Sequence, residues 1–338
     1  MSKGHAKISA PRLLVTQREQ AIWLERARVH ADHGRVIYQT READLQKSYA
    51  IPHANVAILF LGQGTSVTQE ASRLLAEEGV LVAFVGTGGS PLHYGALTNY
   101  GGTTHFRRML TAYIDPEQGL RIAKEMMRER VRFMEKVGFD AIEDHLKTDR
   151  IDGFRRACSR FRPTIDAARD IMSLLGHEGQ YAKALFAAFA GASRMGTDFV
   201  RRQDGGDRSE SPYGQVADPV MVANDLIDHG NYLAYGFAAA ALWALGIPPH
   251  MSVLHGKTRS GGLVFDLADV IKEAIVLPLA FAVASGRIKG DSESVFRAAV
   301  MRQMEKQKVL SLMISFMDRV LPDDPAGLLL NTGKKPDA

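Results

Sequence analysis

The pattern of apolar and polar positions changes about one third of the way along the chain. In the first hundred residues, short apolar runs alternate with glycines and turn residues, which is typical of β-strands. From about residue 116 to about residue 321, apolar residues recur every three to four positions, which predicts helices. The pattern therefore predicts an α+β protein, with a β-rich, sandwich-like domain followed by an all-α domain.

In the first region, the runs that are bounded by turn residues or glycine predict strands at residues 26–31, 35–40, 56–61 and 80–85. The first two of these flank Asp32-His33-Gly34 and predict a hairpin. Ser66-Val67-Thr68-Gln69 has the pattern of a capping box, so a short helix is expected to begin there. Gly79 is expected to stop this helix.

The helical periodicity predicts helices at residues 116–137, 163–176, 178–202, 218–246, 265–285 and 291–320. Pro278 is expected to kink or divide the helix that contains it, because proline lacks the backbone N–H. Residues 203–217 have the composition of an exposed loop. We therefore predict domains at residues 1–110 and 111–322, and a disordered tail at residues 323–338.

Composition narrows the class of protein. With 24% charged and 46% hydrophobic residues, the chain of 338 residues is an ordinary globular protein. Its only cysteine, Cys158, excludes an internal disulfide framework and a cysteine-based zinc cluster, which suits a reducing cytoplasm. The start lacks the apolar core of a signal peptide, and prolines break the longest uncharged run, so no membrane segment is expected.

The formal net charge is only +4, but the arginines are unevenly placed, with clusters at residues 128–132, 150–162 and 201–202. Such clusters favour a surface that binds a polyanion, although solvated helix faces would have the same composition.

The segment at residues 253–273, VLHGKTRSGGLVFDLADVIKE, contains the strongest candidate for a chemical site. Asp266, Asp269 and Glu273 are spaced three and four apart, so a helix points all three the same way. His255 precedes them across a glycine-rich turn. This is the composition of a divalent-metal site, and the excess of oxygen ligands favours Mg²⁺ or Mn²⁺ over Zn²⁺. Alternatively, the aspartates offset the helix dipole and Glu273 is a surface residue.

Other residues suit supporting roles around such a site. Lys257 and Arg259 would suit a phosphate ligand. Glu178 is a candidate for a further metal ligand, or else a charge at a helix N-terminus. Asn224 and His229 belong to a polar run in an otherwise apolar helix, where they either brace the site from behind or make helix–helix hydrogen bonds.

Three blocks of sequence resemble the CRISPR-associated integrase, the metal-dependent endonuclease of the adaptation module, and are closest to its subtype I-F branch. They are IDHGNYLAYG at residues 227–236, ALGIP at residues 244–248 and SVLHGKTRSGGLVFDLAD at residues 252–269. IPHANVAILFLGQGTSVTQEA and GVLVAFVGTGG also resemble the β domain of that family. The resemblance covers roughly residues 20–320.

The resemblance implies which residues form the site. The family's metal ligands correspond to Glu178, His255 and Asp269, and Asp266 is the further acidic neighbour. These residues would use Mg²⁺ or Mn²⁺ for transesterification, in which the 3′-hydroxyl of a short duplex attacks a phosphodiester at the edge of a CRISPR repeat. Lys257, Arg259, Arg201 and Arg202 would contact DNA phosphates.

The family resemblance also implies partners. They are double-stranded and branched DNA, a second copy of the chain in a homodimer, and a small ferredoxin-like adaptation partner, which in subtype I-F is typically fused to the nuclease-helicase.

Two other functions remain open from the residues alone. One is a DNA-binding protein without catalysis, in which the acidic cluster is structural. The other is a metal phosphohydrolase that acts on nucleotides, with the loop at residues 62–68 holding phosphate, because its glycines follow a strand and open a helix. That loop lacks the lysine of a phosphate-binding P-loop, and a tight strand-to-helix connection explains its glycines equally well.

Overall fold

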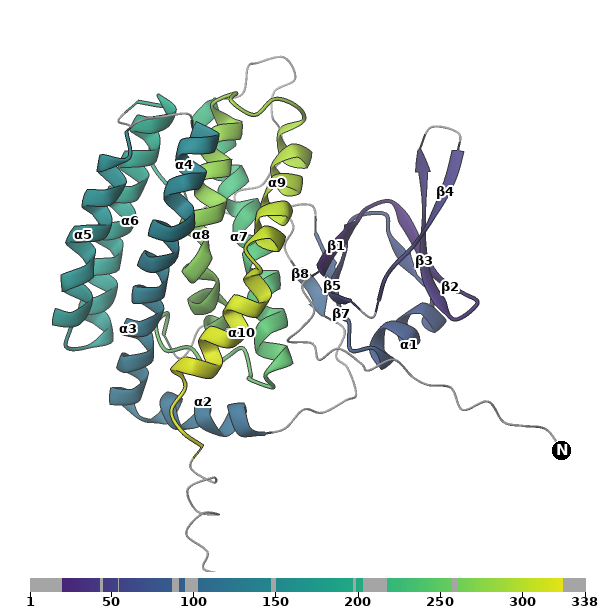
Figure 1. The fold of residues 1–338 in the computed structure, drawn as a ribbon, viewed down its shortest axis with the longest axis horizontal. Helices are drawn as coiled ribbons and strands as arrows, with labels where there is room; N and C mark the ends of the chain where they lie inside the picture. Colours follow the sequence, from purple (N-terminus) through teal and green to yellow (C-terminus); the bar gives the residue numbers. More distant parts are fainter. Residues whose placement is uncertain are drawn as a thin grey trace, which may run out of the picture. The chain divides into compact units, whose positions relative to one another are not determined.

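The computed structural model describes residues 20–42, 45–53, 55–86, 91–94, 103–146, 150–196, 199–202, 218–256 and 261–324 (Figure 1). The chain divides into two compact units, residues 1–87 with 91–100 and residues 88–90 with 101–338. Residue 110, the expected end of the first domain, lies within helix α2 (Thr104–Ile114) of the second unit. Of the expected tail, residues 325–338 lie outside the described residues.

The first unit contains two four-stranded sheets. The first sheet has the order β1 (Gln20–Leu24), β5 (Val56–Leu61), β7 (Leu81–Val85) and β8 (Pro91–Tyr94). The second has the order β4 (Leu45–Ala50), β3 (Arg35–Glu42), β2 (Ala27–Asp32) and β6 (Ser66–Val67). Strands β1, β5 and β7 run parallel, whereas β2, β3 and β4 form an antiparallel meander.

Side chains from both sheets share one hydrophobic core, to which helix α1 (Gln69–Glu77) also contributes. Val29 and Val36 come from the second sheet, Leu59 from the first and Leu75 from α1. Every residue of β5 is buried, which explains why its sequence is a continuous apolar run and does not alternate.

The predicted hairpin and the two apolar strands are confirmed, whereas strands β1, β4, β6 and β8 were not predicted. The predicted capping box is wrong, since Thr68 caps α1 and accepts a hydrogen bond from the backbone N–H of Ala71. Ser66 pairs with Arg28 in the β2–β6 ladder and is therefore held in extended conformation, outside the helix.

The loop at residues 62–68 is tied to the turn between β1 and β2. The Thr65 hydroxyl donates to the carbonyl of Leu24 and accepts from the N–H of Ala27, and the N–H of Gly62 donates to Leu24 as well. These contacts support a tight structural connection, because they engage the Gly62 N–H and the Thr65 hydroxyl, two groups that a bound phosphate could use.

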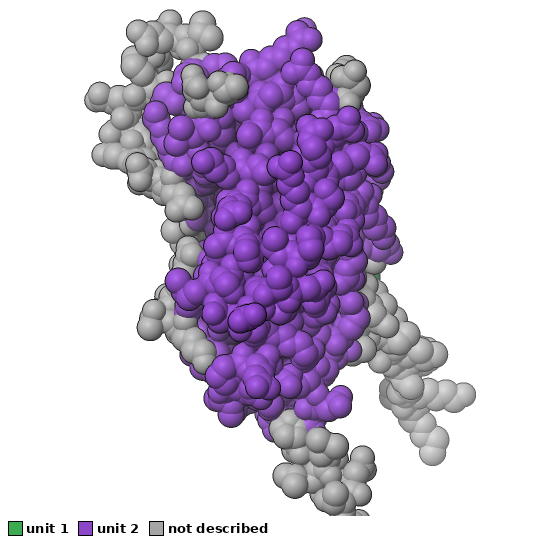
Figure 2. Space-filling model, turned by 90° about the vertical axis from the view of Figure 1, so that its left-hand side faces the viewer, with its two compact units in different colours: residues 1–87, 91–100 green, residues 88–90, 101–338 purple. Residues whose placement is uncertain are grey.

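The second unit is helical (Figure 1). Besides α2, its helices are α3 (Pro116–Phe133), a π-helix (Met134–Gly138), α4 (Phe139–Leu146), α5 (Asp152–Ala167), α6 (Ile171–Ser193), α7 (Pro219–Ala244), α8 (Gly262–Ala284), α9 (Ser292–Lys306) and α10 (Val309–Val320). Seen from the side of α5 and α6, this unit presents a surface of packed side chains (Figure 2). Within the described residues, none of the helices is long and apolar enough to cross a bilayer.

Two predicted helix boundaries near the middle of this unit are wrong. Pro163 lies inside α5 and does not begin a helix; the chain breaks at Ala168, which is extended. Helix α6 then begins after Asp170, whose carboxylate accepts from the N–H of Ser173 in a capping box. Burial of Phe161 and Ile165 on either side of Pro163 outweighs the loss of one backbone hydrogen bond.

Two further expectations need correction. The predicted helix at residues 291–320 is divided into α9 and α10, because Lys308 adopts a left-handed conformation with φ 52°. Pro278 does not divide α8, which continues without a break to Ala284. Since α8 packs against α3, α4, α6, α7 and α9, its surroundings hold it helical where the local sequence would weaken it.

Helices α7 and α8 form the centre of the second unit, and Gly230 allows them to approach closely. A Cβ atom at position 230 would lie 2.4 Å from Cγ1 of Val276 and 2.9 Å from Cζ of Phe296. Only a residue without a side chain fits at this crossing.

We expect Gly230→Ala to lower the free energy of unfolding by about 1–3 kcal/mol, the usual cost of overpacking a core. Chemical denaturation followed by circular dichroism measures the change. Gly176→Ala is the matched control, because a Cβ there meets nothing within 4 Å, so the variant should be unchanged or up to about 1 kcal/mol more stable. Equal effects of the two variants would contradict the close helix crossing.

Candidate functional site

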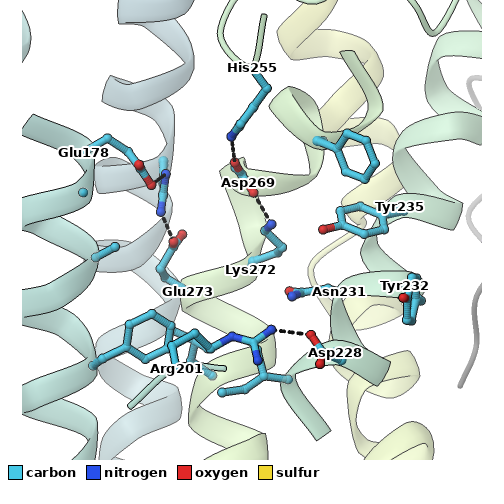
Figure 3. A pocket seen from close by; sticks show the side chains of 17 residues that line it. Glu178, Arg201, Asp228, Asn231, Tyr232, Tyr235, His255, Asp269, Lys272 and Glu273 are labelled. Carbon is cyan, nitrogen blue, oxygen red and sulfur yellow. Dashed lines mark hydrogen bonds and ion pairs between the residues drawn. The ribbon is translucent and has the colours of Figure 1, made fainter. Parts of the chain in front are cut away.

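A cavity of about 600 Å³ lies in the second unit, and side chains from α3, α6, α7 and α8 converge on it (Figure 3). Its charged lining residues are Arg130, Glu178, Arg201, Asp228, His255, Asp269, Lys272 and Glu273. Its other described lining includes Tyr232, Tyr235, Phe186 and Phe265. The cavity therefore combines many charges with an aromatic wall.

Helix α8 points three charged side chains toward this cavity. Lys272 and Glu273 follow Asp269 by three and four residues, and the spacing of the two acids is the one noted in the sequence. Lys272 forms an ion pair with Asp269, and its ammonium group lies 5.2 Å from the centre of the Tyr235 ring. Lys272 was not among the residues predicted for the site, although its place one helical turn after Asp269 was a usable signal.

Asp266 does not line the cavity. It is fully buried, and its Oδ2 accepts from the hydroxyl of Ser252 at 2.9 Å and from the N–H groups of Val253 at 2.8 Å and Leu254 at 3.1 Å. Its Oδ1 accepts from the N–H of His255 at 3.2 Å. These bonds hold the loop before α8, and they give Asp266 a different place from the metal-facing one that the spacing suggested.

Asp266 also orients the imidazole of His255. Nδ1 of His255 lies 2.6 Å from Oδ1 of Asp266, and it donates the bond because a carboxylate can only accept. In the neutral ring, Nε2 is then the nitrogen with a free lone pair. Nε2 lies 3.6 Å from Oδ2 of Asp269, so the two groups share one side of the cavity.

The close approach of this loop to α8 depends on Gly262. A Cβ atom there would lie 2.5 Å from Cβ of Ser252. Gly262, the first residue of α8, therefore allows residues 252–255 to fold over the first turns of this helix.

Arg130 joins the two glutamates of the site. It lies on α3, is 4% exposed, and donates to Oε1 of Glu178 at 2.9 Å and to Oε1 of Glu273. Its guanidinium also lies over the ring of Tyr181, 5.6 Å from the ring centre. Arg130 belongs to the basic cluster at residues 128–132 that was expected to carry DNA, and its burial contradicts that expectation. Burial of Glu273 likewise excludes the alternative that it is a surface residue.

Arg201 lines the end of the cavity that lies away from His255 (Figure 3). Its guanidinium pairs with Asp228 and donates to Oδ1 of Asn224 at 2.9 Å. Asn224 also accepts from the N–H of Arg202 and donates to the carbonyl of Val200. Asn224 thus fastens residues 200–202 to α7, which is a different role from bracing the metal ligands.

His229 is also separate from the cavity lining. Its Nδ1 lies 3.4 Å from Oε1 of Glu293, and its ring contacts Phe296 edge-on. Lys257 and Arg259, the predicted phosphate contacts, lie outside the described residues. Several arginines of the predicted basic clusters are paired with acids within the chain, among them Arg128 with Asp166 and Arg162 with Glu135.

The surroundings of His255 and Asp269, which face each other, shift the pKa of both side chains. Burial opposes protonation of His255, but the hydrogen bond to Asp266 and the charge of Asp269 outweigh it and raise the pKa of the imidazole. Burial likewise opposes ionisation of Asp269, and the cations Lys272 and Arg130, with His255, nevertheless hold the pKa of its carboxyl below the ordinary value. Asp269 is therefore ionised at neutral pH.

The donor types at this cavity suit a divalent cation. Glu178, His255 and Asp269 would contribute two carboxylates and one imidazole nitrogen. Among the described residues, however, no three such side chains already lie close enough together to hold an ion. Lys272 and Arg130 instead neutralise the two carboxylates, so binding an ion requires these cations to give way.

Comparisons with known proteins point to one family. The family model described as CRISPR associated protein Cas1 matches residues 21–313. The chain is 37% identical to the CRISPR-associated endonuclease Cas1 of Pseudomonas aeruginosa and 33% identical to that of Pectobacterium atrosepticum, in each case over 91% of this chain and 94% of the relative.

Among solved structures, one named "Casposase bound to integration product" superposes with a TM-score of 0.65 at 16% identity, covering 94% of this chain and 92% of the other. At that identity the likeness concerns the fold alone. This chain therefore shares with that structure a fold of N-terminal strands followed by a mostly helical region.

We expect Asp266→Asn to lower the free energy of unfolding by about 2–3 kcal/mol, because an amide NH₂ would face N–H donors that now meet a carboxylate. Chemical denaturation measures this change. Asp291→Asn is the matched control, since Asp291 caps α9 and asparagine caps equally well. Wild-type stability of Asp266→Asn would mean that the carboxylate does not hold the loop and is available as a ligand.

Proposed function

The chain belongs to the Cas1 family of CRISPR-associated proteins, and we propose that the cavity lined by α3, α6, α7 and α8 is where this endonuclease and integrase of CRISPR adaptation acts on DNA. The family supplies the activity, and the cavity brings together the residues that such an activity needs.

The reaction is the joining of a short duplex to a CRISPR repeat. The 3′-hydroxyl of the duplex attacks a phosphodiester, the new phosphodiester forms, and the displaced 3′-oxygen of the repeat strand leaves with a proton. When water replaces the 3′-hydroxyl, the same site cleaves DNA, which accounts for endonuclease activity and for nicking of branched DNA.

Nucleases of this family are generally metal-dependent. Glu178, His255 and Asp269 would hold the ion, which we propose to be Mg²⁺ or Mn²⁺ because oxygen donors predominate. Such an ion, when bound, polarises the scissile phosphate and stabilises the charge that develops on it.

The single observation that carries this assignment is the facing pair of His255 and Asp269 at one cavity wall, with Asp266 fixing the ring from behind. A neutral imidazole whose Nδ1–H is held by a carboxylate presents Nε2 as a ligand, an arrangement common in metal sites. Asp266 is thus proposed as the residue that positions His255, in place of the ligand role that its spacing suggested.

Positive groups near the cavity would receive the DNA backbone. We propose that Lys272 neutralises a phosphate oxygen once it leaves Asp269, and that Lys257, Arg259 and Arg202 contact flanking phosphates. Arg201 joins them only by exchanging its partner Asp228 for a phosphate.

The amino-acid sequence of residues 252–269 resembles that of subtype I-F, which supports assignment to this subtype. From the family we propose that the protein acts as a homodimer, together with the small ferredoxin-like adaptation partner that in subtype I-F is typically fused to the nuclease-helicase. The single cysteine, Cys158, supports the proposal that it acts in the cytoplasm. Of the rival functions, the nucleotide phosphohydrolase is disfavoured by the loop at residues 62–68, whose polar groups bind the β1–β2 turn.

Strand transfer in vitro tests the proposal. Purified protein, the adaptation partner, a duplex prespacer and a supercoiled plasmid bearing a repeat are combined with Mn²⁺ or with EDTA. We expect metal-dependent joining that His255→Ala, Asp269→Ala and Glu178→Gln each reduce by at least about a hundredfold, because each removes a ligand.

His177→Ala is the matched control. His177 precedes Glu178 on α6 but does not line the cavity, so joining should remain at the wild-type level. Joining that survives the His255 and Asp269 substitutions would contradict the metal assignment, and DNA binding without joining would favour the non-catalytic alternative.

A further inference from the structure

Among the described lining residues, the carboxylates outnumber the permanently charged cations by one. Among the described lining residues, the carboxylates are Glu178, Asp228, Asp269 and Glu273, and the permanent cations are Arg130, Arg201 and Lys272. Asp228 pairs with Arg201 and Asp269 with Lys272, whereas Arg130 alone serves both glutamates. The surplus carboxylate therefore belongs to the cluster Glu178–Arg130–Glu273.

The two glutamates differ in how freely they can move. The side chain of Glu178 is 21% exposed and that of Glu273 is 8% exposed. Glu273 also has an oxygen, Oε2, that is buried and accepts no hydrogen bond from the described residues. Glu178 is thus the glutamate that can turn into the cavity, and Glu273 is the one that stays beside Arg130.

Arg130 makes the movement of Glu178 costly unless a second anion is present. A buried guanidinium that loses its only partner is strongly unfavourable, because the charge is then neither solvated nor paired. With Glu273 in place, Arg130 keeps a partner when Glu178 turns toward an ion. With a neutral residue in place of Glu273, Arg130 would have Glu178 as its only anionic partner, and this ion pair would stay formed.

We propose that Glu273 is a positioning residue for the metal site, which acts by keeping Arg130 paired so that Glu178 is free to bind the ion. This inference rests on the metal site proposed above and adds to it a residue that does not touch the ion. Glu273 works through Arg130 and thereby sets the affinity of the site for the metal.

The test is Mn²⁺ binding, measured by isothermal titration calorimetry on the full-length protein without DNA. Glu273→Gln keeps the shape and removes the charge, and we expect Mn²⁺ to bind about tenfold or more weakly. Combining Glu273→Gln with Arg130→Met removes the competing cation as well, so the double variant should bind within about threefold of wild type. A purely structural role would not show this rescue.

Glu129→Gln is the matched control, because Glu129 precedes Arg130 on α3, pairs with Arg132 and Arg319, and does not line the cavity. Its Mn²⁺ affinity should equal that of wild type. Thermal unfolding by circular dichroism verifies that each variant is folded.

The outcomes separate this inference from the proposed function. If His255→Ala abolishes Mn²⁺ binding but Glu273→Gln leaves it unchanged, the inference is overturned and the metal site stands. If the double variant binds as weakly as Glu273→Gln, Glu273 is itself a ligand and the positioning role is overturned. If wild type binds no Mn²⁺, the proposed metal site fails and the inference fails with it.

Discussion

Charged side chains buried on α8 are the constraint on which the second unit depends. The helix is enclosed by its neighbours, yet it carries Asp266, Asp269 and Glu273, each less than 10% exposed. A buried carboxylate is tolerable only when it is hydrogen-bonded or paired. Each of these therefore dictates what must lie beside it, and the elements around α8 supply those partners.

Each buried carboxylate is stabilised by a different kind of partner, and these partners determine the role of each residue. The loop before α8 surrounds Asp266 with N–H donors, which turns it into a structural anchor that orients His255. Lys272, on the same helix, pairs with Asp269. Glu273 relies on Arg130 from α3. A pattern of three stacked acids, which looks uniform in the sequence, becomes an anchor, a candidate ligand and a counter-ion.

The protein's own cations explain how an acidic site folds before any ion is bound. Lys272 and Arg130 neutralise the carboxylates that a divalent ion would need. Folding and metal binding therefore compete for the same oxygens, and the cost of the exchange is part of the metal affinity.

The first unit has its own hydrophobic core, to which both sheets and α1 contribute. Its loop at residues 62–68 is hydrogen-bonded to the turn between β1 and β2.

From the sequence alone, the change from strands to helices, the hairpin before residue 42 and the family resemblance of residues 252–269 could be predicted. Those features are local, because the hydrophobic periodicity and the motifs both lie in consecutive residues. The packed fold was needed to show that Pro163 and Pro278 lie inside helices, that Asp266 faces the loop, and that Arg130 lies between Glu178 and Glu273. Burial holds the prolines helical, and Arg130 meets partners 48 and 143 residues away along the chain, which no local pattern encodes.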